Sequence, residues 1–223
     1  MLSIVIPTLN DAHRIETMLE RLSDNDLSCE IIVADGGSED GTAELASRRG
    51  VRVIRGPRGR GSQLSVGAAQ ATGNWLLFLH ADTRPGPGWT TVVRRFMENP
   101  DNRFRAAYFT FALDDPSADA RRLERLVAWR CRKFGLPYGD QGFLISHDFY
   151  DRLGGYKTIP LMEDVDLVAK INTHRLEQLP VSAITSAEKF QRDGYLLRSA
   201  RNLLCLALFL VGVPANYIVP LYR

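Results

Sequence analysis

A carboxylate with a histidine close by stands where an apolar run of the sequence ends. The run Asn74–Leu79 follows a glycine and stops at His80-Ala81-Asp82. Such a run is typical of a strand that is buried on both faces at the centre of a parallel sheet. Because ligands of open α/β sheets bind beyond the carboxyl ends of the strands, Asp82 is a candidate ligand for a metal or a phosphorylated substrate. The alternative is a turn aspartate that caps the next element, since prolines and glycines follow it.

A second acidic cluster, Glu163-Asp164-Val165-Asp166, contains the residue type that general-base chemistry requires. Three carboxylates this close to one another raise the proton affinity of at least one of them, which suits a general base. Acids at the start of a helix also interact favourably with the helix dipole, so simple capping is the alternative interpretation.

Other polar residues stand at the expected ends of strands and at the start of a helix. The turn Pro7-Thr8-Leu9-Asn10-Asp11 and Asp35 each follow an apolar run, and Arg60 and Gln63 stand at or near a helix start. A helix N-terminus with an arginine suits phosphate oxygens, although Arg60 alone could be an exposed loop residue. The sequence contains neither a GxGxxG fingerprint nor a P-loop.

The elements that must position these residues alternate between strand and helix. Strands are expected at Leu2–Ile6, Cys29–Ala34, Val51–Ile54 and Asn74–Leu79, with helices after Asp11, after Asp40 and over Ser62–Ala71. This alternation predicts an α/β fold with a mostly parallel central sheet, right-handed crossovers and flanking helices. Neighbouring strands would then bring the turn 7–11, Asp35 and His80–Asp82 into one cleft.

The regular alternation of strand and helix ends after Pro87. The expected elements are a helix Trp89–Met97, a strand Phe104–Leu113, a turn Asp114–Asp119, a helix Ala120–Phe134, a loop entering a short strand over Tyr138–Ser146, a helix His147–Leu153, a helix from Leu161 to about His174, a strand Leu179–Ile184 and a last helix Gly194–Val211. We expect one domain over 1–223, with a nucleotide-binding half (1–85), an acceptor-binding half (86–190) and a C-terminal helix and tail (191–223).

The net charge and the cysteine content limit the classes of function that the chain can have. A net charge of +2 gives no overall argument for a nucleic-acid partner. Three scattered cysteines, Cys29, Cys131 and Cys205, predict neither a zinc site nor a disulfide framework and favour a reduced, cytoplasmic setting. The first residues lack the basic leader and long apolar core of a signal peptide.

Two segments raise the question of a membrane surface. Leu203–Val213 is apolar but shorter than the about 20 residues that a membrane span requires. It is either a buried helix or a peripheral contact with a membrane, which the basic residues upstream of it would favour. The helix expected over Ala120–Phe134 is rich in arginine, with Leu123, Leu126, Val127 and Phe134 expected to face the core. Its charges are either a solvated face or a site for an anionic substrate or membrane.

Four motifs in this order resemble the family 2 glycosyltransferases of the GT-A fold. SIVIPTLND resembles the opening strand and nucleotide-contacting turn of that family, VADGGSEDGT its Asp-Asp-Gly-Ser segment, GNWLLFLHADT its DXD strand end, and LMEDVDL its Glu-Asp base motif. Later segments, GRGSQLSVGA, GLPYGDQGF, TSAEKFQRDGY and LFLVGVP, resemble a compact bacterial subgroup linked to arsenosugar biosynthesis.

The resemblance implies an inverting transfer of a sugar from a UDP- or GDP-sugar to an acceptor whose identity it does not give, with Asp164 as the catalytic base. Asp82 and His80 would hold Mn²⁺ or Mg²⁺, and Asp140, Gln141 and Glu163 would contact the acceptor. The residues expected to bind the nucleotide sugar are Pro7, Thr8, Asn10, Asp11, Asp35, Gly36, Arg60, Gln63, His80 and Ala81.

Three departures from the family pattern qualify these expectations. Gly36 stands where a base-contacting aspartate is usual, and His80 stands where the first aspartate of the DXD motif is usual. A neutral imidazole can bind Mn²⁺ but supplies no negative charge. The QxxRW-type motif of processive members is missing, which favours transfer of a single sugar.

Two alternatives belong to other functional classes. A nucleotidyltransferase acting on a sugar phosphate would need a glycine-rich basic loop after the first strand, which PTLNDAHR does not provide. A non-catalytic, membrane-associated binding protein would explain Gly36 and His80, but Asp82 and Asp164 argue against it.

Overall fold

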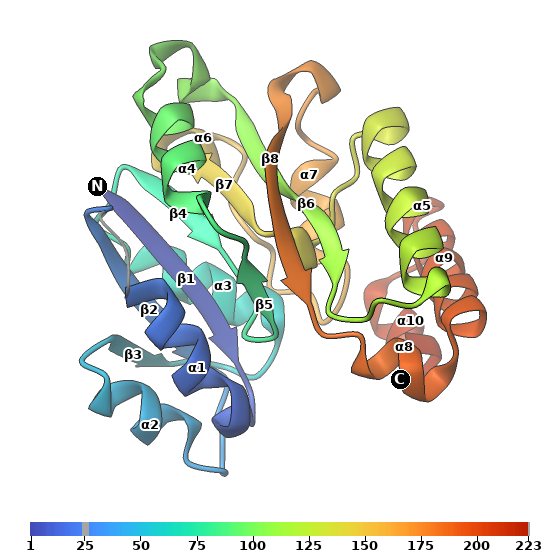
Figure 1. The fold of residues 1–223 in the computed structure, drawn as a ribbon, viewed down its shortest axis with the longest axis horizontal. Helices are drawn as coiled ribbons and strands as arrows, with labels where there is room; N and C mark the ends of the chain where they lie inside the picture. The colour runs from blue at the N-terminus through green and yellow to red at the C-terminus, as the bar shows by residue number, and fades with distance from the viewer. Residues whose placement is uncertain (24–26, 223) are drawn as a thin grey trace.

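The computed structural model describes residues 1–23 and 27–222. In this part of the chain eight strands form one sheet, in the order β3-β2-β1-β4-β7-β6-β8-β5 (Figure 1). The strands are β1 (Leu2–Thr8), β2 (Cys29–Asp35), β3 (Arg52–Arg55), β4 (Trp75–Phe78), β5 (Thr83–Pro85), β6 (Ala106–Leu113), β7 (Phe143–Ser146) and β8 (Leu176–Thr185).

The sheet is parallel in its N-terminal half and mixed beyond it. β1 pairs in parallel with both β2 and β4, and β2 pairs in parallel with β3. β7 is antiparallel to β4 and to β6, whereas β6 and β8 are parallel. The carboxyl ends of β1, β2 and β4 therefore meet at one edge, which confirms the expected α/β architecture.

Helices cover both faces of the sheet because each turns an apolar stripe toward it. In α1, for example, the regularly spaced Ile15, Met18, Leu19 and Leu22 are the buried residues. One face is covered by α1 (Ala12–Ser23), α2 (Thr42–Arg48) and α4 (Trp89–Glu98). The other is covered by α3 (Arg60–Ala69), α6 (His147–Arg152) and α7 (Glu163–Val168).

The remaining helices gather at one end of the molecule (Figure 1). They are α5 (Ala118–Phe134), α8 (Glu188–Asp193), α9 (Tyr195–Leu210) and α10 (Ala215–Tyr222); short 3₁₀ turns η1 (Pro100–Phe104), η2 (Gly139–Gln141) and η3 (Thr173–Arg175) occur elsewhere. α5 packs on β6, and α9 packs against α5, α8 and α10. None of the helices in the described ranges combines the length and apolarity needed to cross a bilayer.

Several expected elements were wrong in extent. The helix expected to reach His174 ends at Val168, and β8 begins at Leu176 rather than Leu179. β5 lies where the sequence predicted no strand, because Thr83–Pro85 pairs with the end of β8. α3 begins at Arg60 rather than Ser62, which places Arg60 in the first turn of the helix.

The helices α10 and α5 also differ from the expected pattern. The chain forms a further helix, α10, after the last helix that the sequence predicted. Pro214 directly precedes the first residue of α10, where its fixed φ is compatible with a helix start. On α5, Leu126 and Phe134 are exposed rather than turned to the core, while Val127 is buried.

Candidate active site

The carboxyl ends of β1 and β4 and the start of α3 enclose a cleft of about 620 Å³. Eight of the residues predicted for the donor and metal sites line it: Pro7, Thr8, Asp11, Arg60, Gln63, His80, Ala81 and Asp82. Elements far apart in the sequence also contribute to the wall, among them Lys189 of α8 and Val219 of α10. The ends of β1 and β4 therefore line one cleft, as the sequence pattern predicted, whereas Asp35 at the end of β2 is not among its lining residues.

Asn10 and Asp35 lie beside this cleft and fix the loops around it. The Asp35 carboxylate is buried and accepts hydrogen bonds from the backbone N–H groups of Gly37 (3.0 Å) and Ser38 (2.9 Å). Asn10 donates its backbone N–H to Ser38 Oγ (2.9 Å) and accepts one from Glu39 N–H (2.9 Å). In this structure both side chains therefore hold the turn that follows β2.

The position of the Gln63 side chain requires a glycine at position 36. The Gln63 side-chain amide donates to the carbonyl oxygens of Thr8 (2.6 Å) and Ala34 (2.9 Å), so it ties α3 to the ends of β1 and β2. A Cβ placed on Gly36 would lie 3.0 Å from the amide of Gln63. The carboxylate that is usual in the family at this position thus has no room while Gln63 keeps these bonds.

His80 forms the floor of the cleft as a neutral ring. Burial, and then the positive charge of Arg60, lower the pKa of His80 to about 4. The ring packs on η2, where a Cβ on Gly139 would lie 2.6 Å from His80 Nε2. Only glycine leaves room for this close approach of ring and backbone.

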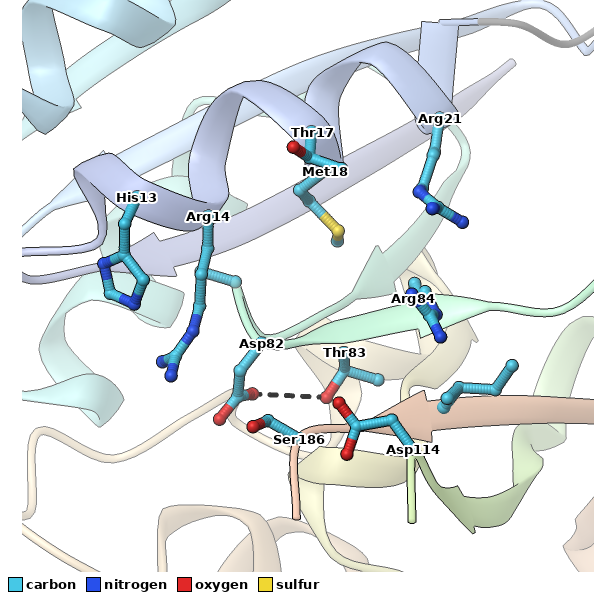
Figure 2. A pocket seen from close by; sticks show the side chains of 12 residues that line it. His13, Arg14, Thr17, Met18, Arg21, Asp82, Thr83, Arg84, Asp114 and Ser186 are labelled. Atoms are coloured by element: carbon cyan, nitrogen blue, oxygen red, sulfur yellow. Dashed lines mark hydrogen bonds between the residues drawn. The ribbon is translucent and has the colours of Figure 1, made fainter. Parts of the chain in front are cut away.

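Asp82 projects beside several cationic side chains. Its Oδ2 lies 3.9 Å from Lys189 Nζ, and its Oδ1 accepts a hydrogen bond from Thr83 Oγ1 (3.3 Å). Figure 2 shows Arg14 and Asp82 projecting into an adjoining pocket of about 240 Å³, with Ser186 close to Asp82. Arg58 and Arg60 line the main cleft as well. The cleft is therefore suited to an anion of high charge density.

Asp164 is held rigidly at the entrance of a second, smaller pocket. Its Oδ2 accepts from Gly139 N–H (2.7 Å) and its Oδ1 from Val165 N–H (2.8 Å). The residue before α7, Met162, adopts the left-handed conformation (φ 65°), which is uncommon for a residue with a side chain. The pocket, of about 70 Å³, is lined by Arg60, Tyr138, Gly139, Asp140, Leu161, Met162, Asp164, Asn202 and Tyr222.

Arg60 stands where the two cavities meet and is fixed by a buried carboxylate. Its Nε lies 2.6 Å from Oε1 of Glu163, whose side chain is only 1% exposed. Burial raises the pKa of Glu163, while Glu163 raises the pKa of Arg60 and so keeps the guanidinium charged. Glu163 thus contacts Arg60, and it does not line the pocket in which an acceptor contact was expected.

The other two predicted acceptor residues differ from each other. Gln141 is buried, with its side chain bonded to Tyr138 N–H (3.2 Å) and to the carbonyl oxygen of Phe109 (3.2 Å). Its amide is used within the protein, so the acceptor contact expected of it is wrong for this conformation. Asp140 does line the pocket, and burial raises its pKa to about 6.

The residues around Asp82 fit a divalent cation only in part. No group of three or more histidine, cysteine or acidic side chains that could hold a metal occurs within residues 1–23 and 27–222. Mg²⁺ is nevertheless commonly held by one or two carboxylates together with substrate phosphates and water. Asp82 can supply one carboxylate, and Asp11 lies near it: burial first, and to a smaller extent the charge of Asp82, raise the pKa of Asp11. The donor set therefore suits a cation that arrives with a diphosphate.

The sequence did not indicate Arg14, Arg58, Lys189, Asn202 or Tyr222 as residues of the site. Arg58 is in a loop without a pattern, and Lys189, Asn202 and Tyr222 lie far in the sequence from the motifs. Arg14 is on α1, three residues after the first motif, where no local pattern marks it. Only the fold brings α8, α9 and α10 to the ends of β1 and β4.

Comparison with known proteins gives consistent results. The family model described as glycosyl transferase family 2 matches residues 3–158. A glycosyltransferase of Haemophilus influenzae is 28% identical over 77% of this chain and 62% of its own length. A PGL/p-HBAD biosynthesis glycosyltransferase of Mycobacterium bovis is 37% identical over 37% of this chain and 35% of its own length. The chain thus spans less than two thirds of these curated relatives.

Solved structures show the same fold. A mannosyltransferase from Pyrobaculum calidifontis, solved with GDP-Man and Mn²⁺, has a TM-score of 0.67 at 20% identity, covering 90% of this chain and 59% of its own. Glucosyl-3-phosphoglycerate synthase from Mycobacterium tuberculosis, solved with Mn²⁺, UDP and glucosyl-3-phosphoglycerate, has a TM-score of 0.64 at 19% identity, covering 96% of this chain and 81% of its own. At these identities the likeness concerns the GT-A-like fold.

Proposed function

Because the chain belongs to glycosyl transferase family 2, we propose that it moves one sugar from a nucleoside-diphosphate sugar to an acceptor hydroxyl, with inversion at the anomeric carbon. The observation that carries this proposal is the position of Arg60. It lines both the large cleft with Asp82 and the small pocket with Asp164. A diphosphate held at Arg60 would have a carboxylate on each side, one near the phosphates and one near the reacting sugar.

On the donor side, the cleft offers positive charge for a diphosphate. Arg58, Arg60 and Lys189 line it. Asp82, with the neutral His80 beside it, would hold a divalent cation, and that cation would supply further neutralisation of the leaving diphosphate. GDP-Man and UDP with Mn²⁺ occupy structural neighbours, which supports a UDP- or GDP-sugar as donor.

On the acceptor side, Asp164 is the general base. It takes the proton of the acceptor hydroxyl while that oxygen forms a bond to the anomeric carbon. The bond from the anomeric carbon to the diphosphate oxygen breaks on the opposite face, and the diphosphate leaves with the electron pair. The N–H groups of Gly139 and Val165 each fix one carboxylate oxygen, and each oxygen keeps a second lone pair that can receive the proton.

The finer expectations stay predictions. They include the arsenosugar subgroup, the division at residues 85 and 190, and a peripheral, cytoplasmic location. Asp140, with Tyr138 beside it, is the acceptor-binding candidate that the pocket supports. Membership of a glycosyltransferase family argues against the nucleotidyltransferase alternative.

A panel of nucleotide sugars tests the proposal. Thermal unfolding of the intact chain is measured with UDP-, GDP- and other nucleotide sugars, each with Mn²⁺, with Mg²⁺ or with a chelator. Ligands that bind only the folded state raise the midpoint, so one donor is expected to shift it by several degrees. That donor should also release its nucleoside diphosphate slowly in the presence of enzyme. Absence of a shift and of release with every donor would contradict the proposal.

A further inference from the structure

An unpartnered apolar face runs along α9. Its members recur at intervals of seven residues, and Leu196 and Val211 are 89% and 78% exposed. The large side chains of this face, which we call the leucine face, are Leu196, Leu197, Leu203, Leu204, Leu210 and Val211. The opposite side of α9 is already buried through Arg198, Cys205 and Leu206. Soluble proteins seldom expose a contiguous apolar surface of this kind without a partner.

The neighbouring helix α5 exposes positive charge and aromatic rings. Trp129 and Phe134 are each 51% exposed and pack edge to face, with their ring centroids 5.4 Å apart. Arg125, Arg132 and Lys133 are exposed on the same helix. We call these five residues the basic face of α5. Figure 1 shows α5, α9 and α10 together at one end of the molecule.

The two helices pack against each other, and the combination of exposed apolar side chains on α9 with exposed cationic and aromatic ones on α5 fits a specific kind of surface. Aromatic rings are favoured at the boundary between acyl chains and headgroups, and lysine and arginine are attracted to anionic headgroups. We propose that the leucine face of α9 and the basic face of α5 together bind the surface of an anionic lipid bilayer. In this proposal α5 and α9 lie on the bilayer surface, and no helix within residues 1–23 and 27–222 has the length and apolarity to cross it.

A second copy of the chain is the competing occupant, and charge argues against it. A two-fold dimer across the leucine face would bring two α5 helices, each with a cluster of exposed cations, toward one another. Anionic headgroups would instead neutralise these cations. The arrangement thus favours lipid over self-association.

The same end of the molecule also carries part of the site. Asn202 of α9 and Tyr222 of α10 line the pocket next to Asp164. Docking through α9 would therefore place the walls of this pocket close to the bilayer. The docking itself does not depend on the proposed function, because it requires neither donor nor turnover.

Vesicle flotation of the intact chain tests the proposal. The vesicles are phosphatidylcholine alone or an equal mixture of phosphatidylcholine and phosphatidylglycerol. The chain is expected to float with the anionic vesicles, and a smaller fraction should float at high salt. Its affinity for neutral vesicles should be lower by about tenfold or more. Equal binding to both compositions, or none to either, would overturn the proposal.

Two variants separate the two faces. Leu196→Gln/Leu203→Gln/Leu210→Gln changes exposed positions only and should abolish flotation while the thermal midpoint is kept. Arg125→Glu/Lys133→Glu should weaken binding to anionic vesicles about tenfold or more. Arg48→Glu/Arg95→Glu, at exposed sites on α2 and α4, is the matched control with the same change of charge and should bind as the wild type does.

The oligomeric state is measured on the same samples by light scattering. A monomer that floats supports the proposal. A stable dimer that the triple glutamine variant dissociates, without flotation, would show that a second copy covers the leucine face and would overturn it. Flotation retained by an Asp164→Asn variant separates lipid binding from sugar transfer.

Discussion

The two sides of the site hold their central carboxylates in different ways. Asp82, on the donor side, bonds to its neighbour Thr83 and faces Lys189 at 3.9 Å, beside a large cleft. Asp164, on the acceptor side, is fixed by two backbone N–H groups beside a small pocket. Under the proposed function, the first arrangement would let Asp82 exchange one cation for another as ligands arrive, whereas the second would set the direction of proton transfer to Asp164. The difference indicates that donor binding and chemistry can be changed independently.

The largest change is expected in the stability of the Arg60→Met variant, because Arg60 lines both the large cleft and the small pocket. Arg60→Met leaves the buried Glu163 carboxylate without its ion-pair partner, which costs about 3 kcal/mol or more in the free energy of unfolding. Arg60→Met/Glu163→Leu should recover much of that loss in urea unfolding. Arg58→Met, at an exposed position in the same cleft, should leave stability unchanged. Additive effects of the two single variants would argue against the pairing.

A pH-dependent effect is expected at Asp140 on the acceptor side. Burial raises its pKa from 3.8 to about 6, so the folded state holds this proton more tightly than the unfolded state. The contribution to stability is fully present below about pH 4 and is lost as the pH rises through about 6. Asp140→Asn should therefore stabilise the chain at pH 7.5, by up to about 3 kcal/mol, and not at pH 4. Asp101→Asn, at an exposed site, is the control; an equal gain at both pH values would contradict the assignment.

Lys189 tests the donor side alone. Lys189→Met removes one positive charge next to Asp82. It should weaken binding of the donor about tenfold, because that is roughly the contribution of one hydrogen bond to a charged group. Arg192→Met, on the same helix but outside the cleft, should bind the donor as the wild type does. Calorimetric titration of both variants measures this, and equal affinities would remove Lys189 from the site.

The smallest effect is expected at Gly36. Gly36→Ala pushes the Gln63 amide away from the carbonyl oxygens of Thr8 and Ala34 and should cost about 1 kcal/mol of stability. At Gly56 an added Cβ meets Val66 at an ordinary 3.7 Å, so Gly56→Ala should be neutral or slightly stabilising. Chemical denaturation distinguishes the two, and equal stabilities would show that Gln63 has room to move.

The donor side was the more predictable from sequence. Apolar runs that end in Thr8, Asp35 and His80 predict parallel strands, and a parallel sheet brings such ends together whatever the details of the helices. Asp164 was also a candidate, because an acidic cluster at a helix start is a local pattern; the structure places it in the small pocket, and its role as a base stays a prediction. The GT-A-like fold expected from the motif order is confirmed by the solved structures.

The acceptor side was less predictable because burial and distant contacts decide it. Glu163 and Gln141 are polar residues in or next to loops, and nothing local shows that one is buried against Arg60 and the other against Phe109. Lys189, Asn202 and Tyr222 reach the site only because α8, α9 and α10 pack beside it. The exposed positions of Leu126 and Phe134 likewise depend on which side of α5 meets β6.

The central claim is that Asp82 serves the binding of the donor and Asp164 serves chemistry. The most direct test measures donor affinity by calorimetry and nucleoside-diphosphate release on a matched pair of variants, Asp82→Asn and Asp164→Asn. Asp82→Asn should lose most donor affinity, in the presence of Mn²⁺ above all. Asp164→Asn should bind the donor as the wild type does and lose turnover by about a hundredfold or more. Loss of donor affinity in both variants, or turnover retained by Asp164→Asn, would contradict this account.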